Sequence, residues 1–359
     1  MKKKLLLIGG GHAHLYVIKK LQEEAIDAEV SVISPSEHQY YSGMFSGFME
    51  GLYEFEKIRI HIPTLAKKAN VTFIKGAALS IDAEAKVVLT EKGDIVPYDV
   101  LSIDIGSYTG GIDVPGVRQH ALRIKPTYRI EEVVSKLWDA DEPVVVGGGA
   151  AGIEMALSLH AKRRSEDAPV TLVTQSTLLA GETEKATSKI QEIAKEKGLR
   201  VYEHEKVSNV TSSHVITAGG KQIAYDELLW LTGPKAPGIF QTSKLPVDPQ
   251  GYLLVEDTLQ VREYPAIFAA GDCASIKGFP KLPKSGVIAV RQSKVLWDNI
   301  KSFIKGEDGT RFQPKQSYLS ILSTGNREGL LLYSNLSFHH HLSWKLKNKI
   351  DRKFVETYK

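Results

Sequence analysis

Cysteine is almost absent from this sequence. Cys273 is the single cysteine in 359 residues, so the chain forms no intramolecular disulfide and contains no Cys-x-x-Cys redox pair. A metal site built mainly from cysteine thiolates is excluded for the same reason. Functions that depend on paired thiols of this chain are therefore ruled out.

Long apolar runs are also missing. The longest ones, such as LLLI at 5–8 and VVV at 144–146, are far too short to cross a bilayer. The N-terminal MKKK precedes only four apolar residues before the glycines begin, which is too little for a secretory signal. We therefore expect a cytoplasmic location.

Most of the chain lacks an excess of one charge. The formal net charge is +4, and residues 339–359 alone hold six Lys or Arg against two Asp or Glu. The other 338 residues carry 40 basic and 40 acidic side chains, so we expect no extended basic surface for nucleic acid. We expect the run His339–His341 to be a solvated turn and not a metal site.

The sequence does contain an internal repeat. LLLIGGGHAHLYVIKKL at 5–21 and PVVVGGGAAGIEMALSL at 143–159 both have an apolar strand, three glycines and a helical pattern. YDVLSIDIG at 98–106 and YDELLWLTG at 225–233 share their Tyr, Asp, Leu and Gly positions. We call each pair of matching segments an echo. The two segments are 138 residues apart in the first echo and 127 residues apart in the second. They predict two dinucleotide-binding folds in one chain.

The strand patterns agree with this prediction. AEVSVIS at 28–34 and APVTLVT at 168–174 follow the two glycine turns, and strand–turn–helix–strand units with short links form parallel sheets. Residues 71–103 and 201–231 have the pattern of successive short strands with turns. The expected fold class is α/β, with two Rossmann-like domains around parallel sheets, small antiparallel sheets and a C-terminal element.

The second glycine turn carries the complete G-x-G-x-x-G pattern as Gly147, Gly149 and Gly152. The first glycine permits the turn, the second lets a pyrophosphate approach the backbone, and the third allows the helix to pack on the strand. The free N–H groups of the following helix then face the phosphates. We expect this turn to bind NAD(P).

The carboxylate that usually binds the ribose of NAD is missing from the next strand end. The sequence there has Thr174, Gln175 and Ser176, and the cations Lys162, Arg163 and Arg164 lie on the preceding helix. The pattern therefore leaves NADH and NADPH open.

The first turn departs from the pattern at one position. Gly9 and Gly11 are present, and His14 replaces the third glycine. Its side chain either packs or caps the turn or reaches a phosphate, and the sequence leaves His12 equally open. The next strand ends in Ser34 and Pro35, although Glu37 follows close behind. The helix N–H groups remain available whatever side chain is at position 14.

A third segment decides the class. YPAIFAAGDCA at 264–274 has the pattern of a buried strand that ends in Gly271 and Asp272. With two nucleotide folds before it, the chain resembles the flavin-dependent pyridine-nucleotide oxidoreductases with two dinucleotide-binding domains. In that family the aspartate after this strand binds the ribityl and phosphate part of FAD, which assigns this contact to Asp272. Cys273 beside it is expected to be a packing residue.

Within that superfamily the chain resembles the type II NADH dehydrogenase-like proteins. GGGHAH at 9–14, YYSGM at 40–44, PKSGVIAVRQ at 283–292 and LSWKLKNKIDRKFV at 342–355 are similar to one bacterial branch. The resemblance implies FAD contacts at Gly9, Gly11, His12, Ala13, His14, Ser34, Pro35, Ser42, Gly43, Ala77, Gly106, Gly271, Asp272 and Lys284. It implies NAD(P) contacts at Gly147, Gly149, Ala150, Gly152, Glu154, Thr174 and Gly233.

Chemistry in this class is carried by the flavin, which the protein orients and tunes. The resemblance implies hydride transfer from NAD(P)H to FAD and onward electron transfer to a quinone or another small acceptor. Lys284 is a candidate neighbour of the flavin pyrimidine. Gln292 is a candidate acceptor-site residue, although only this glutamine of the A-Q-x-A-x-Q pattern of typical type II dehydrogenases is present.

The C-terminal segment has a helical pattern. Leu342, Leu346, Ile350 and Phe354 recur every four residues on one face, and basic residues flank it. Such a helix is typical of membrane-surface binding, as in type II dehydrogenases. The alternative is that the stripe packs on the protein body while the lysines stay in water.

We expect four segments. The FAD domain takes 1–112 and 255–310, the NAD(P) domain takes 113–254, and 311–359 forms a cap. Two rival functions remain open: a reductase of a soluble protein carrier, and a non-catalytic FAD-binding sensor or scaffold. A homodimer also stays open.

Overall fold

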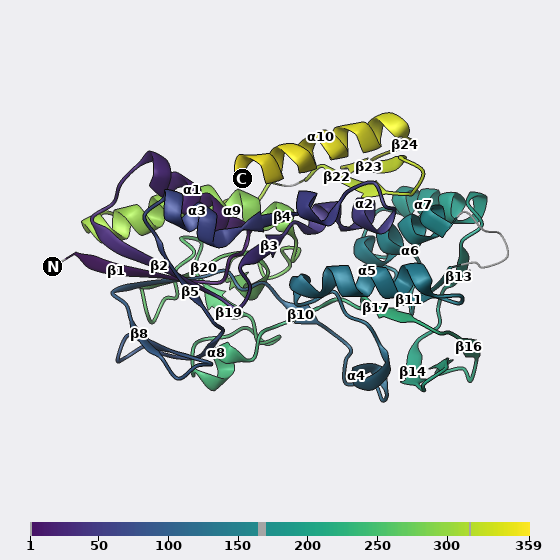
Figure 1. Cartoon of the computed structure of the whole chain (residues 1–359), viewed down its shortest axis with the longest axis horizontal. Helices are drawn as coiled ribbons and strands as arrows, with labels where there is room; N and C mark the ends of the chain where they lie inside the picture. The colour runs from purple at the N-terminus through teal and green to yellow at the C-terminus, as the bar shows by residue number, and fades with distance from the viewer. Residues whose placement is uncertain (1, 164–169, 316) are drawn as a thin grey trace.

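The computed structural model describes residues 2–163, 170–315 and 317–359. Two lobes lie side by side, and the C-terminal helix α10 (His341–Thr357) runs along the top of the molecule (Figure 1). The first lobe is built on a five-stranded parallel sheet in the order β20-β9-β1-β2-β5. Its strands are β20 (Ile267–Ala269), β9 (Val100–Ile103), β1 (Lys3–Ile8), β2 (Ala28–Ser34) and β5 (Thr72–Lys75).

Helices cover this sheet and bury its central strands. The main ones are α1 (His12–Glu23), α3 (Ile62–Lys68) and α9 (Gly286–Lys305), and α1 packs on both α3 and α9. Leu5, Leu6 and Leu7 of β1 are all buried. A near-continuous apolar strand is typical of a parallel sheet that is covered on both faces.

The second lobe repeats the arrangement with a four-stranded parallel sheet in the order β13-β12-β11-β17. Its strands are β13 (Arg200–Tyr202), β12 (Thr171–Val173), β11 (Val144–Val146) and β17 (Leu228–Trp230). The helices α5 (Ile130–Asp139), α6 (Ala150–Arg163) and α7 (Glu184–Glu196) accompany it.

The register confirms the internal repeat. Leu6 of β1 is opposite Leu101 of β9, and Val144 of β11 is opposite Leu228 of β17. These pairs are equivalent in the two sequence echoes, so both echoes map onto one structural unit that occurs twice. The fold class predicted from the sequence is confirmed.

Small sheets extend the lobes. The antiparallel ones are β6-β7-β8 (Ala78–Asp82, Val87–Thr90, Ile95–Pro97), β14-β15-β16 (Val207–Val210, His214–Thr217, Gln222–Ala224), β3-β4 (His38–Tyr40, Arg59–His61) and β22-β23-β24 (Ser320–Ser323, Gly329–Tyr333, Leu336–His340). Strand β19 (Leu253–Val255) pairs with β21 (Ala274–Ile276) in parallel. Strand β10 (Tyr108–Thr109) pairs antiparallel with β18 (Pro234–Lys235), and so joins the chain segments that follow β9 and β17.

The remaining elements are short. They are η1 (Ser42–Met44), α2 (Phe45–Met49), η2 (Phe55–Lys57), α4 (Val117–His120), η3 (Thr127–Arg129), α8 (Ile239–Thr242) and η4 (Gly271–Cys273). Helix α2 of the first lobe packs against α6 of the second, and α6 also contacts β22. The boundary between the lobes is therefore a packed contact and not only a linker.

The histidine run was predicted as a solvated turn, and this prediction is wrong. His339 and His340 end β24, and His341 begins α10. The His339 ring bonds to the Thr324 hydroxyl at 2.9 Å, and the His340 ring accepts the N–H of Leu342 at the start of the helix. These side chains terminate a strand and cap a helix. None of the described helices is long and apolar enough to span a membrane.

Candidate functional site

The second glycine turn connects β11 to α6. A Cβ on Gly152 would lie 1.9 Å from the carbonyl oxygen of Gly147, so any side chain would push the helix away from the strand. Gly147 has a φ of +137°, which disfavours other residues there. A Cβ on Gly149 would meet nothing within 4 Å. This glycine therefore leaves open space above the turn, where a phosphate group can approach the backbone.

The edge of the second sheet holds a carboxylate that sequence reasoning missed. Glu203 follows β13, and its carboxylate accepts the N–H of Leu178 at 2.6 Å and the Gln191 amide at 2.8 Å. Leu179, which follows Leu178, donates its N–H to the carbonyl oxygen of Gly148 in the turn at 2.9 Å. The sequence pattern concerns the end of β12, whereas Glu203 follows the neighbouring strand β13.

The other residues predicted to contact NAD(P) have varied surroundings. Thr174 is buried behind the turn, close to the Cβ position of Gly148. Ala150 begins α6, and Gly233 has a φ of +52° with open space at its Cβ position. Arg164, one of the cations noted on the preceding helix, lies outside the described residues.

The first glycine turn connects β1 to α1 and differs from the second at its middle glycine. A Cβ on Gly9 would lie 2.3 Å from the carbonyl oxygen of Asp104, as in the other turn. A Cβ on Gly11 would lie 2.2 to 2.3 Å from the Asp104 carboxyl atoms. The Asp104 side chain therefore occupies the place that is open beside Gly149.

Asp104 binds the N-terminus of α1 from outside the helix. Its Oδ2 accepts the N–H of Ala13 at 2.8 Å and that of His14 at 3.2 Å. Burial, together with the nearby carboxylate of Asp272, raises the pKa of Asp104 to about 7 against the lowering effect of these two amides. The first helical amide, that of His12, has no acceptor among the described residues.

His14 has a packing role. Its ring is fully buried, with Nδ1 2.6 Å from the Gly9 carbonyl oxygen and Nε2 2.8 Å from the Ser102 hydroxyl. Burial lowers its pKa to about 4. Both ring nitrogens are thus used inside the protein, which supports the packing alternative over the phosphate alternative.

His12 is different, because its Nε2 is buried without a hydrogen-bond partner in the described part of the chain. The ring lies 5.5 Å from that of Tyr41 and 5.4 Å from that of Phe354 on α10, between centroids. Burial lowers its pKa to about 4. An unpaired buried nitrogen at this place is a candidate ligand-facing group.

Asp272 lies in η4 at the carboxyl end of β20. It accepts the Ser107 hydroxyl at 3.1 Å and pairs with the Lys125 ammonium at 3.4 Å. Gln292 of α9 supports the same turn, since its amide oxygen accepts the N–H of Gly271 at 2.7 Å. Gln292 is only 1% exposed, so its contact with an acceptor stays a prediction.

Lys284 precedes α9 and lies with Gly271 and Gln292 around a small cavity of about 10 Å³. Its Nζ donates to the carbonyl oxygen of Ala274 and lies 4.1 Å from the Tyr252 ring centroid. Burial lowers its pKa. The buried Cys273 thiol nearby has its pKa raised to about 12 by burial, as a packing residue would.

The remaining FAD candidates lie along the carboxyl edge of the first sheet and in η1. Ser34 ends β2 and donates to the carbonyl of Ser36, and Pro35 lies between them. Ala77 donates its N–H to Glu91, and Gly106 has a φ of +70° with open space at its Cβ position. Ser42 and Gly43 lie in η1. Glu37, the alternative acid, pairs with Lys75 at 3.0 Å.

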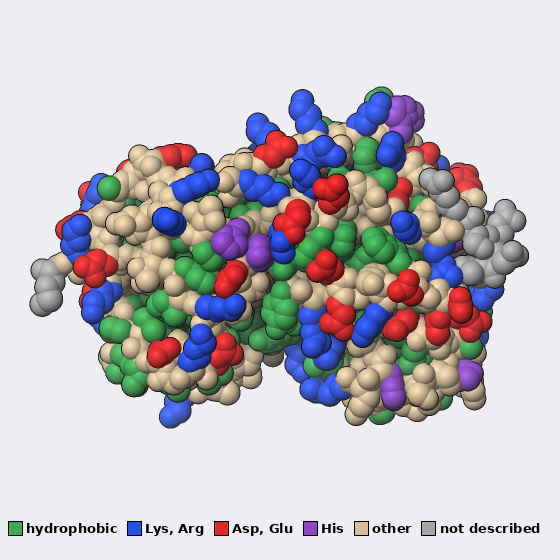
Figure 2. Space-filling model, in the orientation of Figure 1, with side chains coloured by type: hydrophobic (Ala, Val, Ile, Leu, Met, Phe, Trp, Pro, Cys, Tyr) green, Lys and Arg blue, Asp and Glu red, His purple; other side chains and the backbone are tan. Residues whose placement is uncertain are grey.

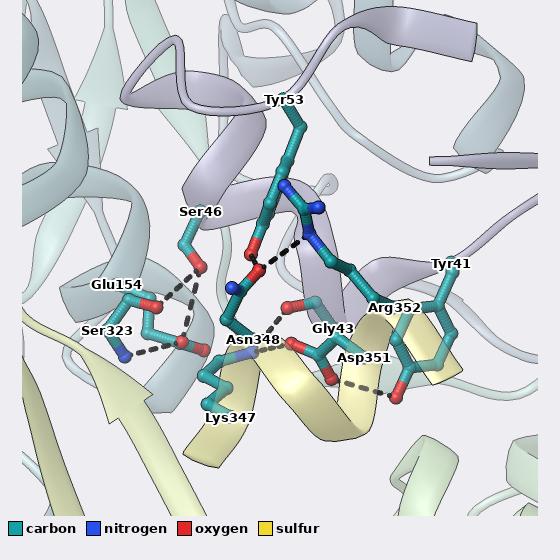
Figure 3. A network of polar contacts seen from close by, with 10 residues as sticks. All are labelled: Tyr41, Gly43, Ser46, Tyr53, Glu154, Ser323, Lys347, Asn348, Asp351 and Arg352. Carbon is teal, nitrogen blue, oxygen red and sulfur yellow. Dashed lines mark hydrogen bonds and ion pairs between the residues drawn. The ribbon is translucent and has the colours of Figure 1, made fainter. Parts of the chain in front are cut away.

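A polar network joins these segments to the C-terminal helix (Figure 3). Lys347 of α10 donates to the Gly43 carbonyl and pairs with Asp351 at 2.7 Å, and Tyr41 donates to Asp351 at 3.1 Å. Burial raises the pKa of Asp351 against the effect of Lys347. Although burial alone lowers the pKa of Lys347, the carboxylates of Glu154 and Asp351 raise it.

Glu154 of α6 belongs to the same network. Its carboxylate accepts the N–H of Ser323 at 2.8 Å, and Ser46 of α2 donates to it at 3.4 Å. Burial raises the pKa of Glu154. Through buried charges the network thus connects η1 and α2 with the second lobe and with the C-terminal unit, which consists of β22–β24 and α10. The hydrogen bonds of the Glu154 carboxylate are made within this network. Its contact with NAD(P) stays a prediction.

Comparison with known proteins gives a consistent result. Residues 3–293 match the model of the family described as "Pyridine nucleotide-disulphide oxidoreductase". A "Probable NADH dehydrogenase" of Dictyostelium discoideum is 26% identical, over 92% of this chain and 80% of that protein. A "Type II NADH:quinone oxidoreductase" of Staphylococcus saprophyticus is 24% identical, over 87% and 85%. NDH2 from Plasmodium falciparum, solved in complex with NADH, superposes with a TM-score of 0.86 at 15% identity, over 100% and 98% of the two chains.

Proposed function

Since this chain belongs to the pyridine nucleotide-disulphide oxidoreductase family, we propose that it is an NADH dehydrogenase that passes electrons through FAD to a quinone. As a member of that family it is an oxidoreductase that acts on NAD(P)H and uses FAD. The observation that carries the proposal is the pair of glycine turns, one for each dinucleotide. The strands beside the two turns pair in equivalent register. The similarity to NADH dehydrogenases supports the finer assignment.

The residues of the first lobe fit FAD. The His12 amide lacks an acceptor among the described residues, the His12 Nε2 is buried without a partner, and a Cβ on Gly106 would face open space. The N-terminus of α1 would hold the pyrophosphate, because it offers the His12 N–H and partial positive charge. Asp272 would accept hydrogen bonds from the ribityl hydroxyls, and Lys284 would lie beside the flavin ring.

The residues of the second lobe fit NADH. Gly149 leaves the space that a pyrophosphate needs, and Glu203 adds a carboxylate at the edge of the sheet, next to the ion pair of Glu205 with Lys221. A 2′-phosphate would be repelled by carboxylates there, whereas ribose hydroxyls can donate to them. When bound, FAD would supply the hydride and electron-transfer chemistry, so no nucleophile of this chain is required.

The acceptor that we propose is a membrane quinone, because the outer face of α10 suits a lipid surface. Leu342, Leu346 and Ile350 are 54%, 40% and 45% exposed, so the alternative that this stripe packs on the protein body is wrong for these three. Phe354 alone packs inward, against Tyr41 at 4.3 Å. Lys345, Lys349 and Lys353 are also exposed on this helix, and Figure 2 shows Lys and Arg side chains along this edge of the molecule. Such a face suits anionic lipid headgroups.

The test is reduction of the flavin under anaerobic conditions. We expect NADH to bleach the flavin absorbance of the purified holoprotein faster than NADPH does, and a water-soluble quinone to restore it. A holoprotein that neither nucleotide reduces would overturn the proposal in favour of a non-catalytic flavoprotein. Reoxidation by a ferredoxin-type carrier but by no quinone would overturn the acceptor alone.

A matched pair of variants tests the nucleotide site. In Gly149→Ala the new methyl group meets no protein atom, so the fold should be kept, while close approach of the pyrophosphate is blocked. We expect KM for NADH to rise at least about tenfold. This change corresponds to about 1.4 kcal/mol, a small part of the free energy with which a dinucleotide binds. Gly219→Ala also adds a methyl group without a clash, in the turn between β15 and β16, and should leave KM unchanged.

A further inference from the structure

The two glycine turns of this chain provide an internal comparison. Beside Gly149 the space is open, whereas beside Gly11 it is filled by the carboxylate of Asp104. The counterpart of Asp104 in the second echo is Leu231, which carries no charge. Of the two turns, the one that we assign to FAD is therefore the one with an acid, at the helix end that would hold the pyrophosphate.

The position of this carboxylate is defined by the backbone on both sides. The Asp104 N–H donates to Ile8 at 2.9 Å, and the Asp104 carbonyl accepts the N–H of Gly11 at 3.2 Å. The side chain is only 3% exposed. It binds the Ala13 and His14 amides through one oxygen, Oδ2, and cannot leave this place without exposing both amides or moving β9.

We propose that Asp104 takes up a proton when FAD binds, so that this protein holds its flavin less tightly as the pH rises. An ionised carboxylate and a pyrophosphate at the same helix end repel each other and compete for the same partial positive charge. A protonated carboxyl can still accept an amide N–H and can donate its own O–H to a phosphate oxygen. Binding of one FAD then consumes one proton from solvent, which is carried on the Asp104 carboxyl. This inference rests on the proposed flavin cofactor.

Among the groups around Asp104, the Asp104 carboxyl is the one whose protonation changes near neutral pH. On α1, burial lowers the pKa of His12 and His14 to about 4, so both rings stay neutral. On η4, burial raises the pKa of the Cys273 thiol to about 12, and Asp272 is paired with Lys125. Gln292 of α9 is uncharged, and Lys284 lines one small cavity together with Gly271 and Gln292. The Asp104 carboxyl itself has its pKa raised to about 7 by burial.

The experiment measures FAD binding and not turnover. Apoprotein is titrated with FAD at several values between pH 6.5 and pH 8.5, and binding is followed by quenching of flavin fluorescence. We expect the dissociation constant to rise about 10- to 30-fold across this range, because each pH unit above the free carboxyl pKa costs up to tenfold. In Asp104→Asn, which keeps the amide-binding oxygen without the charge, the constant should change by less than about twofold.

The matched control is Asp99→Asn, which changes the same group at the other end of β9. Asp99 is exposed and accepts the Lys4 N–H, so this variant should keep the pH dependence of the parent. If Asp104→Asn does not fold, calorimetry of the parent at pH 8 in two buffers of different ionisation enthalpy decides. Uptake of more than about half a proton per FAD supports the proposal.

Three results would overturn the proposal. They are a dissociation constant of the parent that is flat with pH, the same pH dependence in Asp104→Asn as in the parent, and no proton uptake at pH 8. No flavin binding at any pH would overturn the cofactor assignment as well, which distinguishes the two failures.

Discussion

The two glycine turns of this protein differ at three equivalent positions. Where the second lobe has Gly152, Leu229 and Leu231, the first has His14, Ser102 and Asp104. The three polar residues bond to one another, since His14 contacts Ser102 through its ring and Asp104 through its amide. In the second turn the third glycine lets the helix approach the Gly147 carbonyl, and in the first turn the His14 ring binds the equivalent carbonyl of Gly9. In the first turn a hydrogen bond from the His14 ring thus takes the place of the close backbone contact that Gly152 allows in the second.

His14 should therefore matter for stability and not for flavin contact. His14→Ala removes a buried ring and leaves the Gly9 carbonyl and the Ser102 hydroxyl unpaired, which should cost about 3 kcal/mol. We expect the thermal midpoint of the apoprotein to fall by several degrees. His14→Gly, once folded, should hold FAD as tightly as the parent, and a large loss of affinity would show that the ring reaches the phosphates.

The pH dependence of His14 has a definite sign. Its pKa is about 4 in the folded state and about 6.5 when unfolded, so the unfolded state binds more protons between these values. Stability from this group is therefore full above pH 6.5 and is lost as the pH falls towards 4, by up to about 3 kcal/mol. The gap between the thermal midpoints of parent and His14→Ala should narrow from pH 7.5 to pH 5, and a constant gap would contradict this.

At the scale of elements, α10 has its polar residues inside and part of its apolar residues outside. Its buried side chains are Ser343, Lys347, Asp351 and Val355. Three of the four leucine, isoleucine and phenylalanine residues in the predicted stripe face solvent. Hydrophobic burial therefore contributes less to this helix than usual, and the buried ion pair and its partners position it.

The ion pair of α10 can be tested by removing its cation. Lys347→Met leaves the buried carboxylates of Asp351 and Glu154 without their partner, and breaking such a pair costs about 3–5 kcal/mol. We expect a lower thermal midpoint and faster proteolysis of the C-terminal unit. Lys349→Met on the exposed face of the same helix is the control. The double variant Lys347→Met/Asp351→Leu should regain part of the loss, and a failure to do so would argue against an ionic cause.

The outer face of α10 can be tested with vesicles. Leu346→Gln/Ile350→Gln should lower binding to anionic vesicles at least about tenfold, because each side chain loses about 1.5 kcal/mol of apolar burial. Reduction of a soluble acceptor by NADH should be unchanged. The matched control is Leu79→Gln/Ile95→Gln, which alters two apolar residues that are even more exposed, in a small sheet away from α10 (Figure 1). Equal losses in both variants would argue against a specific docking face.

At the scale of the whole molecule, segments distant in sequence build the edge at which we propose that the flavin binds. The first sheet takes strands from residues 3–103 and adds β20 at 267–269. Helix α9 packs on α1, and α10 brings Phe354 to within 5.4 Å of the His12 ring centroid. A ligand along this edge would contact both the N-terminal and the C-terminal segments, so its binding should stabilise the molecule as a whole.

Cys273 offers a direct readout of that stabilisation. The thiol is fully buried and its pKa is raised to about 12, so it should react with an alkylating reagent only when the structure opens. FAD at 100 times its dissociation constant adds about 2.7 kcal/mol and should slow alkylation about 100-fold. Riboflavin, which lacks the pyrophosphate, is the control. Equal protection by both would place the main contacts at the flavin ring and not at the glycine turn.

The sequence by itself determined the repeated unit. Glycine spacing, the YD…G echo and the apolar strands are local patterns, so they predict local structure and the parallel pairing that short links impose. The strand at 28–34 and the glycine turns were predicted from these patterns, and β2 and both turns confirm them. The class of enzyme was implied by the family resemblance that these motifs and Asp272 carry.

Only the tertiary structure decided which charges meet. Asp104 lies 90 residues from His14 in the chain, and Glu154 lies 169 residues from Ser323, so no local pattern links them. The same is true of Glu203 beside the second turn and of the outward leucines of α10. Their energies depend on burial and on long-range hydrogen bonds, which arise only when sheet edges and helix ends come together.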